Sequence, residues 1–310
     1  MPPTLSIVVP VYQSEKILPV LAERLSVVLP TLANRFEVIL VNDGSQDQSW
    51  QVICELATQF AWLRGIDLMR NYGQHNALLC GIRAAQNEII VTMDDDLQNP
   101  PEEIQKLLAR LEEGYDVVYG MPAKEQHGLW RVLASQVTKL VMQNALGTHT
   151  ATMVSAFRAF RQPVREAFAN YQGSYVSIDV LLTWGTRRFS ALPARHDMRY
   201  AGKSNYTFRK LVAHTMNMVT GFSRLPLQIA SLIGFLLTLF GLGILLFVLG
   251  RYLVEGGSVA GFPFLASIIA IFSGAQLFAL GIMGEYIARI HARILDQPPY
   301  TVRVQKQNQP

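Results

Sequence analysis

The chain has 310 residues, of which 50% are hydrophobic and 16% are charged, and its formal net charge at pH 7 is +4. Up to about residue 223 it has the composition of a soluble α/β protein, whereas two long uncharged stretches follow. Basic residues crowd the segments beside those stretches, where anionic lipid attracts them. The positive charge therefore does not indicate a nucleic-acid-binding protein, and we expect no nucleic-acid partner.

The N-terminal segment MPPTLSIVVPVY has neither the basic region nor the long apolar region of a signal peptide. It is typical of the first strand of a folded domain. Cys54 and Cys80 are the two cysteines, and their spacing does not match a metal site. Both are expected to be ordinary buried thiols.

Apolar strands and helices alternate through the first 120 residues. Strands are expected at 5–12, 36–43, 63–69, 88–94 and 115–120, and helices at 16–32, 47–60, 73–86 and 100–114. Such alternation predicts a doubly wound α/β domain with a parallel sheet covered on both faces. Ligands of these sheets bind beyond the carboxyl ends of the strands. This rule selects three segments, PVYQSE, VNDGSQD and MDDDLQ.

The acidic triplet in VTMDDDLQNPPEEI is the most unusual of the three. In an extended segment alternate side chains point the same way, so Asp94 and Asp96 are expected to converge while Asp95 faces elsewhere. Mg²⁺ or Mn²⁺ accepts such oxygen ligands together with substrate phosphates, and Gln98 offers another oxygen. The alternative is an acidic turn that caps the following helix. No glycine-rich phosphate loop is present, so a phosphate ligand would need a metal or basic side chains.

Four motifs then carry a resemblance. SIVVPVYQSE, VILVNDGSQDQS, RNYGQHNALLCGIRAA and VTMDDDLQNPPEEI resemble, in order and spacing, the family-2 glycosyltransferases of GT-A (nucleotide-diphospho-sugar transferase) fold, and in particular their polyprenyl-phosphate branch. That branch includes dolichyl-phosphate mannose synthases and bacterial bactoprenol glucosyltransferases, and the two C-terminal apolar stretches match the second type.

The resemblance implies roles for individual residues. Asp94, Asp96 and Gln98 would hold a divalent metal on the nucleotide diphosphate. The nucleoside pocket would be lined by Pro10, Tyr12, Glu15 and Asp43. The role of Asp95 stays open by contrast: it contacts the ribose, pairs with a neighbouring cation or caps the next helix. Two departures from the family pattern are Gln13 and Ser14 before Glu15, and Asn42 in place of an acid before Asp43. The alternative for NDGS is a plain turn.

Basic side chains suited to phosphate follow. In LWRVLASQVTKLVMQNALG, Arg131, Ser135 and Lys139 share one helical face. The resemblance favours Arg131 and Ser135 as phosphate contacts over a merely solvated basic face. In SAFRAF, Arg158 lies between aromatic residues in a predicted strand and should have an anionic partner.

The segment RHDMRYAGKSNYTFRK resembles the Arg-x-x-Gly-x-Ser loop of the branch. Here Arg199 and Lys203 would clamp the donor diphosphate and the acceptor phosphate, with Ser204 beside them. A juxtamembrane patch attracted to anionic lipid is the alternative. Asp179 is the one acid near the expected position of a general base, and it either acts as that base or orients a cation such as Arg199.

The membrane part begins with an expected interfacial amphipathic helix at 206–224, after a catalytic domain at 1–205. Two spans are expected at about 225–252 and 260–284 within a membrane domain at 225–310 that ends in a cytoplasmic tail. Basic residues flank the outer ends of the pair, so both termini and the catalytic domain are expected on the cytoplasmic face of the cell membrane. Glycines in both spans favour close packing within one chain or in a homo-oligomer.

The expected reaction is transfer of one sugar, foremost glucose from UDP-glucose, onto undecaprenyl or another polyprenyl phosphate with inversion. A phosphomonoester is largely dianionic at neutral pH, so a general base is optional. Other donors, namely an amino-arabinose derivative, GDP-mannose or UDP-N-acetylglucosamine, use the same machinery. A processive synthase is disfavoured by the small number of spans, and a non-catalytic scaffold or flippase by the intact acidic pair.

Overall fold

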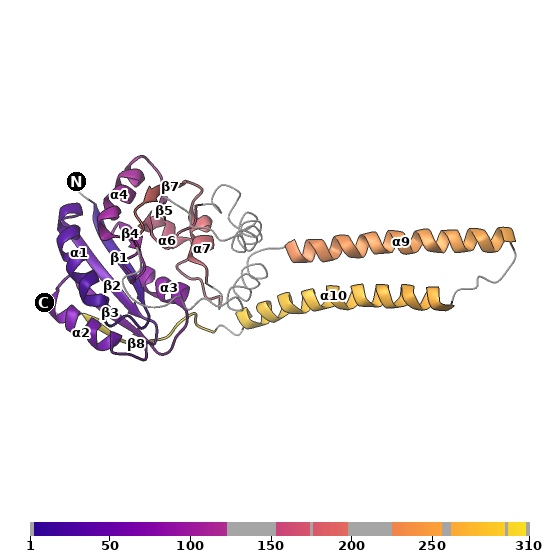
Figure 1. Ribbon diagram of the computed structural model, residues 1–310, viewed down its shortest axis with the longest axis horizontal. Helices are drawn as coiled ribbons and strands as arrows, with labels where there is room; N and C mark the ends of the chain where they lie inside the picture. Colours follow the sequence, from indigo (N-terminus) through magenta and orange to yellow (C-terminus); the bar gives the residue numbers. More distant parts are fainter. Residues whose placement is uncertain are drawn as a thin grey trace. The chain divides into compact units, whose positions relative to one another are not determined.

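The computed structural model describes residues 3–122, 153–173, 176–197, 225–255, 262–294 and 297–307 (Figure 1). The chain divides into two compact units. Unit 1 comprises Met1–Phe208 and Asp296–Pro310, and unit 2 comprises Arg209–Leu295. The C-terminal residues therefore belong to the α/β unit, whereas the sequence led us to expect a tail of the membrane domain.

The described residues of unit 1 form an eight-stranded sheet in the order β7-β5-β6-β4-β1-β2-β3-β8. The strands are β1 Thr4–Val11, β2 Arg35–Asn42, β3 Leu63–Leu68, β4 Ile89–Thr92, β5 Val117–Pro122, β6 Arg158–Arg161, β7 Phe189–Ala194 and β8 Val302–Gln307. The central strands β1 to β4 are parallel, but β6 and β8 run antiparallel to their neighbours. The α/β prediction is confirmed, and the expectation of a parallel sheet is corrected to a mixed one.

Helices cover both faces of this sheet. They are α1 Leu18–Leu32, α2 Ser49–Gln59, α3 Gln74–Ala84, a 3₁₀ turn Pro101–Glu103, α4 Ile104–Glu112, α6 Gln162–Glu166 and α7 Ile178–Gly185. One hydrophobic cluster contains buried residues of α1, α2 and α4, and a second contains buried residues of α3, α6 and α7. The two faces thus have separate cores, as a doubly wound sheet requires.

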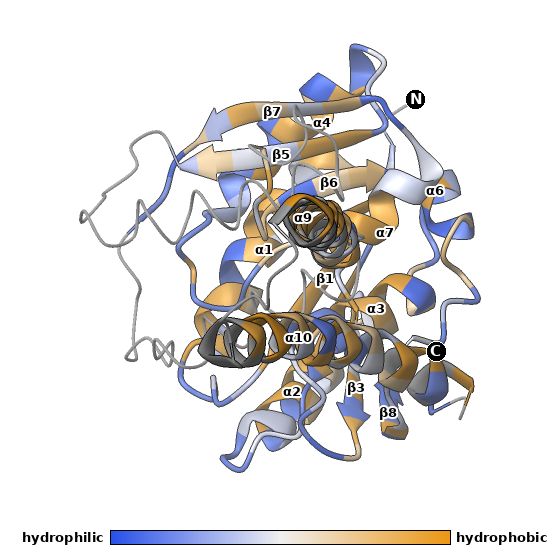
Figure 2. Ribbon diagram, turned by 90° about the vertical axis from the view of Figure 1, so that its right-hand side faces the viewer, coloured by the Kyte–Doolittle hydropathy of each residue, from blue (hydrophilic) through white to orange (hydrophobic). Residues whose placement is uncertain are grey.

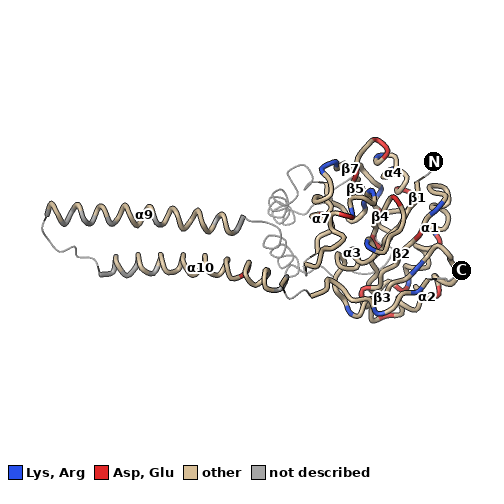
Figure 3. The backbone as a smooth tube through the Cα atoms, turned by 180° about the vertical axis from the view of Figure 1, so that it is seen from behind, with Lys and Arg blue, Asp and Glu red and all other residues tan. Residues whose placement is uncertain are grey.

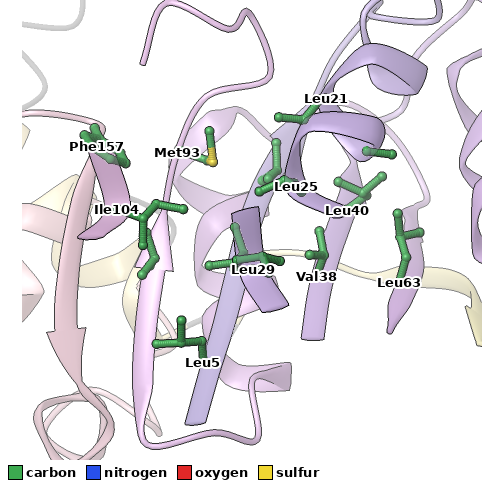
Figure 4. Close-up of a cluster of buried hydrophobic side chains, with 14 of the residues drawn as sticks. Leu5, Leu21, Leu25, Leu29, Val38, Leu40, Leu63, Met93, Ile104 and Phe157 are labelled. Carbon is green, nitrogen blue, oxygen red and sulfur yellow. The ribbon is translucent and has the colours of Figure 1, made fainter. Parts of the chain in front are cut away.

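The first core shows why α1 forms where it does. Its buried residues Leu18, Leu21, Leu25 and Leu29 recur at helical spacing, so they form one face. In Figure 4 the labelled leucines of α1 lie between the helix and the strands. Leu25 and Leu29 are completely buried, and burying each stabilises the fold by about 1.5–3 kcal/mol.

The described residues of unit 2 form two long helices, α9 Leu225–Glu255 and α10 Phe262–Ile294. Both are coloured tan along nearly all of their described length, because they carry few charged residues (Figure 3), and the described turns of α9 are predominantly hydrophobic (Figure 2). Within the residues that can be searched, one 18-residue window, Ile271–Ala288, is long and apolar enough to cross a membrane. The first expected span contains a shorter apolar segment, Ala230–Ile244. The expectation of two spans is therefore met for one of them.

The two helices of unit 2 contact each other through a glycine. A Cβ at Gly241 of α9 would lie 2.8 Å from Cζ of Phe272 in α10, so the ring packs directly on the helix backbone. A Cβ at Gly243, Gly274 or Gly281 would meet nothing within 4 Å. Gly241, one of the glycines expected to form a small-residue surface, thus contacts the other helix of the same chain. A homo-oligomer stays a prediction.

Candidate active site

The carboxyl ends of β1, β2, β3 and β4 bring four loops to one edge of the sheet. Backbone hydrogen bonds tie the first, second and fourth strands together there, because Asp43 N donates to Val11 O at 2.9 Å and Met93 N donates to Val8 O at 3.2 Å. The three segments selected from the sequence therefore lie side by side. A fourth loop, at 69–73, joins them and was not selected.

The loop after β1 is held in an unusual backbone conformation. Gln13 has φ 56, in the left-handed region that non-glycine residues seldom occupy. Its N–H donates to Ser45 Oγ at 3.0 Å, while Ser14 N donates to Ser49 Oγ at 2.9 Å. The loop is thereby fastened to the segment after β2, and such local strain is often found at functional sites.

The residues expected to bind the nucleoside differ in their surroundings. Pro10 is buried within β1, whereas Tyr12 is 40% exposed at the end of that strand. Glu15 accepts a hydrogen bond from Gln48 N at 3.0 Å through Oε2, at the residue that precedes α2. Tyr12 therefore offers an accessible ring, and Glu15 also organises the second loop.

Asp43 is engaged with the loop at 69–73. Its two carboxylate oxygens accept hydrogen bonds from Tyr72 N at 2.7 Å and Gly73 N at 2.9 Å. Burial raises the pKa of Asp43, and these two N–H groups oppose that shift. Gly44, at φ +63, lies so close to this loop that a Cβ would be 2.4 Å from the carbonyl carbon of Arg70. The turn and the nucleoside interpretations of NDGS are thus compatible, since Asp43 shapes the loop.

Asn42 explains the departure from the family's acidic pair. Its Nδ2 donates to Asp67 Oδ1 at 2.7 Å, and both side chains are almost fully buried. An acid at this position would place two carboxylates in contact at a buried site, which costs free energy. An amide at residue 42 avoids this repulsion and donates a hydrogen bond to Asp67 instead.

The acidic triplet lies in a turn. Strand β4 ends at Thr92, Asp95 and Asp96 form the turn, and Leu97 has φ 59. The premise of an extended segment with alternating side chains was therefore wrong, because the chain bends at Asp95. Each carboxylate has its own neighbour instead.

Those neighbours come from three different segments. Asp94 Oδ1 accepts a hydrogen bond from Gln74 Nε2 at 2.6 Å, and Asp95 Oδ2 accepts one from Ser14 Oγ at 2.5 Å. Asp96 Oδ1 accepts from Gln98 N at 3.1 Å. The triplet thus joins the loops after β1 and β3 to its own turn.

Negative charge accumulates at this turn. Burial raises the pKa of Asp95 to about 6, Ser14 opposes the shift, and Asp96 adds to it. In the part of the chain that is described, no three His, Cys, Asp or Glu side chains are arranged to hold a metal ion. Asp94 and Asp96 could supply two ligands, and the others would come from substrate phosphate and water, the usual arrangement for Mg²⁺.

Arg158 has the anionic partner that its burial demands. It forms an ion pair with Asp179 and donates from Nε to Thr92 Oγ1 at 3.0 Å, and its side chain is 2% exposed. Tyr119 donates from its hydroxyl to Asp179 Oδ1 at 3.1 Å, and burial raises the pKa of Tyr119 well above its ordinary value. The prediction of a partner for Arg158 is confirmed.

This ion pair also bears on Asp179. Its carboxylate is already engaged by a guanidinium and a phenol, in a site that is 5% exposed at this residue. The arrangement favours the role of orienting a cation over that of a general base. The cation beside Asp179 is Arg158, and Arg199, the cation suggested by the sequence, lies outside the described residues.

Gln74 is a residue that sequence reasoning missed. It belongs to the quoted segment RNYGQHNALLCGIRAA and is the first residue of α3, which starts at the carboxyl-end edge of the sheet. The same rule that selected the other loops would have selected it. Five expected phosphate or catalytic residues, Arg131, Ser135, Arg199, Lys203 and Ser204, lie outside the described residues, as do Lys139 and the expected interfacial helix.

The sequence matches a protein-family model and individual relatives. A model described as Glycosyl transferase family 2 matches residues 6–168, more than half of the chain. The undecaprenyl-phosphate 4-deoxy-4-formamido-L-arabinose transferase of Yersinia enterocolitica is 35% identical over 301 residues, covering 96% of this chain and 92% of the relative. The protein of the same name from Salmonella paratyphi B is 33% identical over the same coverage.

Solved structures share the fold at lower identity. Glucosyl-3-phosphoglycerate synthase from Mycobacterium tuberculosis, crystallised with Mn²⁺, UDP and glucosyl-3-phosphoglycerate, has a TM-score of 0.53 at 16% identity, covering 70% of this chain and 78% of that one. Mannosyl-3-phosphoglycerate synthase from Rubrobacter xylanophilus has a TM-score of 0.50 at 15% identity, covering 70% and 72%. These likenesses concern the fold alone.

Proposed function

Because the chain belongs to glycosyltransferase family 2, with a GT-A-like fold and a mixed sheet, we propose that it transfers one sugar from a nucleotide diphosphate to undecaprenyl phosphate. The observation that carries the acceptor is the 35% identity, over 96% of the chain, to a relative named for that transfer. The same name favours 4-deoxy-4-formamido-L-arabinose as the donor sugar. Glucose, which we expected first, becomes the second candidate.

A divalent cation is proposed at Asp94 and Asp96, with Gln98 beside them. Asp94 and Asp96 flank Asp95, whose pKa burial raises to about 6, and a cation would stabilise this run of three carboxylates. Bound there, Mg²⁺ or Mn²⁺ would neutralise the charge that develops on the leaving diphosphate. Gln74 would keep the Asp94 carboxylate oriented for that task.

The donor nucleoside is proposed to lie over the loops after β1 and β2. The exposed ring of Tyr12 would contact it, and Pro10, Glu15 and Asp43 would shape the pocket. Asp43 would act partly through the loop at 69–73, which it holds by two hydrogen bonds. A carboxylate has lone pairs beyond those two, so it could also accept a hydrogen bond from the nucleoside.

The acceptor phosphate is proposed to attack the anomeric carbon directly. A phosphomonoester with a second pKa of about 6 is already a dianion at neutral pH, so no side chain has to remove a proton. The engagement of Asp179 with Arg158 supports a mechanism without a base. Attack from the face opposite the leaving group would invert the anomeric centre. Basic groups at Arg131, Arg199 and Lys203, with Ser135 and Ser204, are proposed to bind the two phosphate groups.

A membrane hairpin is proposed for unit 2. Residues 209–295 interrupt the α/β unit, because β8 follows them and pairs with β3 in the same sheet. If α10 alone crossed a bilayer, β8 would be on the opposite side from β3. A second crossing would return β8 to the side of β3, and α9, which is 31 residues long, could provide it. Both termini would then face the cytoplasm, as the basic residues favour.

A donor panel tests this function. The purified full chain would be incubated with undecaprenyl phosphate, Mg²⁺ or Mn²⁺, and one labelled donor: UDP-linked 4-deoxy-4-formamido-L-arabinose, UDP-glucose, GDP-mannose or UDP-N-acetylglucosamine. Label should enter the organic phase with the formamido sugar. Transfer of glucose alone would restore the second candidate. Absence of transfer with every donor would overturn the enzyme assignment in favour of a non-catalytic membrane protein.

A further inference from the structure

The C-terminal segment that follows unit 2 lies against the loop at 69–73. We propose that this segment, Tyr300–Arg303, is a positioning strap that holds the loop in the conformation needed for donor binding. The proposal rests on the proposed function, since it assigns the loop to the donor site. It adds a role for residues that are more than 200 positions away from that loop in sequence.

The outer side of the loop is fastened by the strap. Met69 N donates to Thr301 O at 2.9 Å, and Arg303 Nη2 donates to Met69 O at 2.8 Å. A hydrogen bond with the Thr301 side chain lowers the pKa of the Tyr72 hydroxyl. Both ends of the loop are thus bound to residues at the start of β8.

Arg303 extends this attachment into the sheet. Its Nη1 donates to Asp67 Oδ2 at 3.2 Å, and Asp67 is the residue whose other oxygen accepts from Asn42. Asp67 is 2% exposed, so its carboxylate depends on these partners for stabilisation. The strap therefore completes a chain of contacts that runs from β8 through β3 to the end of β2.

The inner side of the loop faces the acidic groups of the site. Tyr72 N and Gly73 N donate to Asp43, and the next residue, Gln74, donates to Asp94. A displacement of the loop would consequently disturb Asp43 and Asp94 together. The loop connects the strap to both the proposed nucleoside pocket and the proposed metal ligand.

Tyr300 adds a contact with α3. Its ring lies 5.8 Å from the guanidinium carbon of Arg83, and its hydroxyl forms a hydrogen bond with Cys80. Both residues belong to α3, the helix that begins at Gln74. The strap thus fixes the helix that carries Gln74 as well as the loop before it.

The loop needs such support because little of it is buried. Met69 is 48% exposed, and Arg70 and Asn71 are also exposed. Segments with few buried apolar contacts open at low free-energy cost. Hydrogen bonds to the strap on one side and to Asp43 on the other hold this loop in place.

The test compares Arg303→Met and Thr301→Ala with a matched control, Lys306→Met, on the same strand. Lys306 lies opposite Gly65 rather than beside the loop. Arg303→Lys should change the exchange rate and KM less than Arg303→Met does, because lysine keeps a hydrogen-bond donor but lacks the forked geometry of arginine. The full chain is used throughout, and melting temperature is recorded for each variant.

Two readouts are compared. Hydrogen exchange of a peptide that covers residues 69–76, measured without donor, should be faster by roughly threefold to tenfold in Arg303→Met and unchanged in Lys306→Met. The KM for the nucleotide sugar should rise by a similar factor, with kcat within about twofold. Unchanged exchange in Arg303→Met and Thr301→Ala would overturn the strap. Faster exchange throughout unit 1 would also overturn the proposal, because Tyr300–Arg303 would then stabilise the whole unit and not the loop at 69–73 in particular.

The exchange measurement separates this proposal from the proposed function. Suppose that the unmodified chain transfers no donor. Faster exchange confined to residues 69–76 in Arg303→Met would still show that the strap holds the loop, while the assignment of the loop to a donor site would fail. If transfer is normal and neither exchange nor KM responds to Arg303→Met, the strap fails while the transferase assignment stands.

Discussion

Gln74 Nε2 lies 2.6 Å from Asp94 Oδ1, so the first residue of α3 holds the first carboxylate of the acidic triplet. The contact joins the loop after β3 to the turn after β4. It places a neutral donor beside a carboxylate that we propose as a metal ligand.

Gln74→Ala should lower kcat/KM by about tenfold to 100-fold, because residues that orient a metal ligand commonly have effects of this size. The metal concentration that gives half-maximal activity should rise as well. Gln51→Ala is the matched control, since Gln51 bonds to Glu55 on the exposed side of α2. Metal titration of activity measures both variants, and an unaltered titration curve for Gln74→Ala would show that Asp94 does not need this contact.

Asp96→Ala should abolish transfer while the protein still enters the membrane. The substitution removes one of the two proposed metal ligands without touching unit 2, and chelation of divalent cations should have the same effect on the unmodified chain. Glu23→Ala, which removes an exposed carboxylate from α1, should leave transfer unchanged. Activity and membrane fractionation are the measurements, and retained transfer in Asp96→Ala would refute the metal assignment.

Asp179→Ala should destabilise the protein by about 3–5 kcal/mol, because it leaves the buried Arg158 guanidinium without a counter-ion. Replacing both residues, in Arg158→Leu/Asp179→Leu, should recover much of that loss, since an apolar pair can replace a buried ion pair. Denaturant unfolding gives the free energies. Should Asp179→Asn abolish transfer while the stability is unchanged, Asp179 would have to be reconsidered as a base.

Cys80 should resist alkylation in the folded protein. Burial raises the pKa of its thiol to about 12, with Tyr300, Arg83 and Arg64 opposing the shift. The thiol is harder to ionise in the folded state than in the unfolded one, where its pKa is near 9. The contribution of the neutral Cys80 thiol to the free energy of unfolding is therefore fully present below pH 9. It is lost as the pH rises toward 12, by up to about 1.4 kcal/mol per pH unit.

Mass spectrometry after iodoacetamide treatment checks this expectation at pH 9, with the urea-unfolded chain as the control. Cys80 should be modified in the unfolded sample and unmodified in the native one. Equal modification of both samples would show that the α3 packing around Cys80 opens readily.

The proposed membrane hairpin makes a further prediction. In a background without the native cysteines, a cysteine introduced at Lys306 should react with an impermeant reagent from the cytoplasmic side, and one introduced at Gly257, between the two helices, from the opposite side. This follows because β8 must rejoin the sheet that contains β3. Labelling of both positions from the same side would exclude a hairpin that crosses the bilayer.

The sequence by itself was sufficient for the alternating α/β architecture and for three of the four loops at the candidate site. Parallel strands covered by helices have a recognisable apolar pattern, and their carboxyl ends necessarily meet at one edge. The family motifs could also be recognised from the sequence, because each is a short contiguous segment. The need of Arg158 for an anionic partner also followed from local context, since a charge among aromatic residues must be compensated.

Only the tertiary structure identified the partners. Gln74 with Asp94, Ser14 with Asp95, and Asp43 with the loop at 69–73 join segments that are 20 to 81 residues apart, and their pairing depends on the turn geometry at Asp95 and Leu97. Strand β8 was not predicted because its six residues are mostly exposed and follow a membrane-like helix. Its place beside β3 depends on pairing across the interruption at 209–295, which no local pattern encodes.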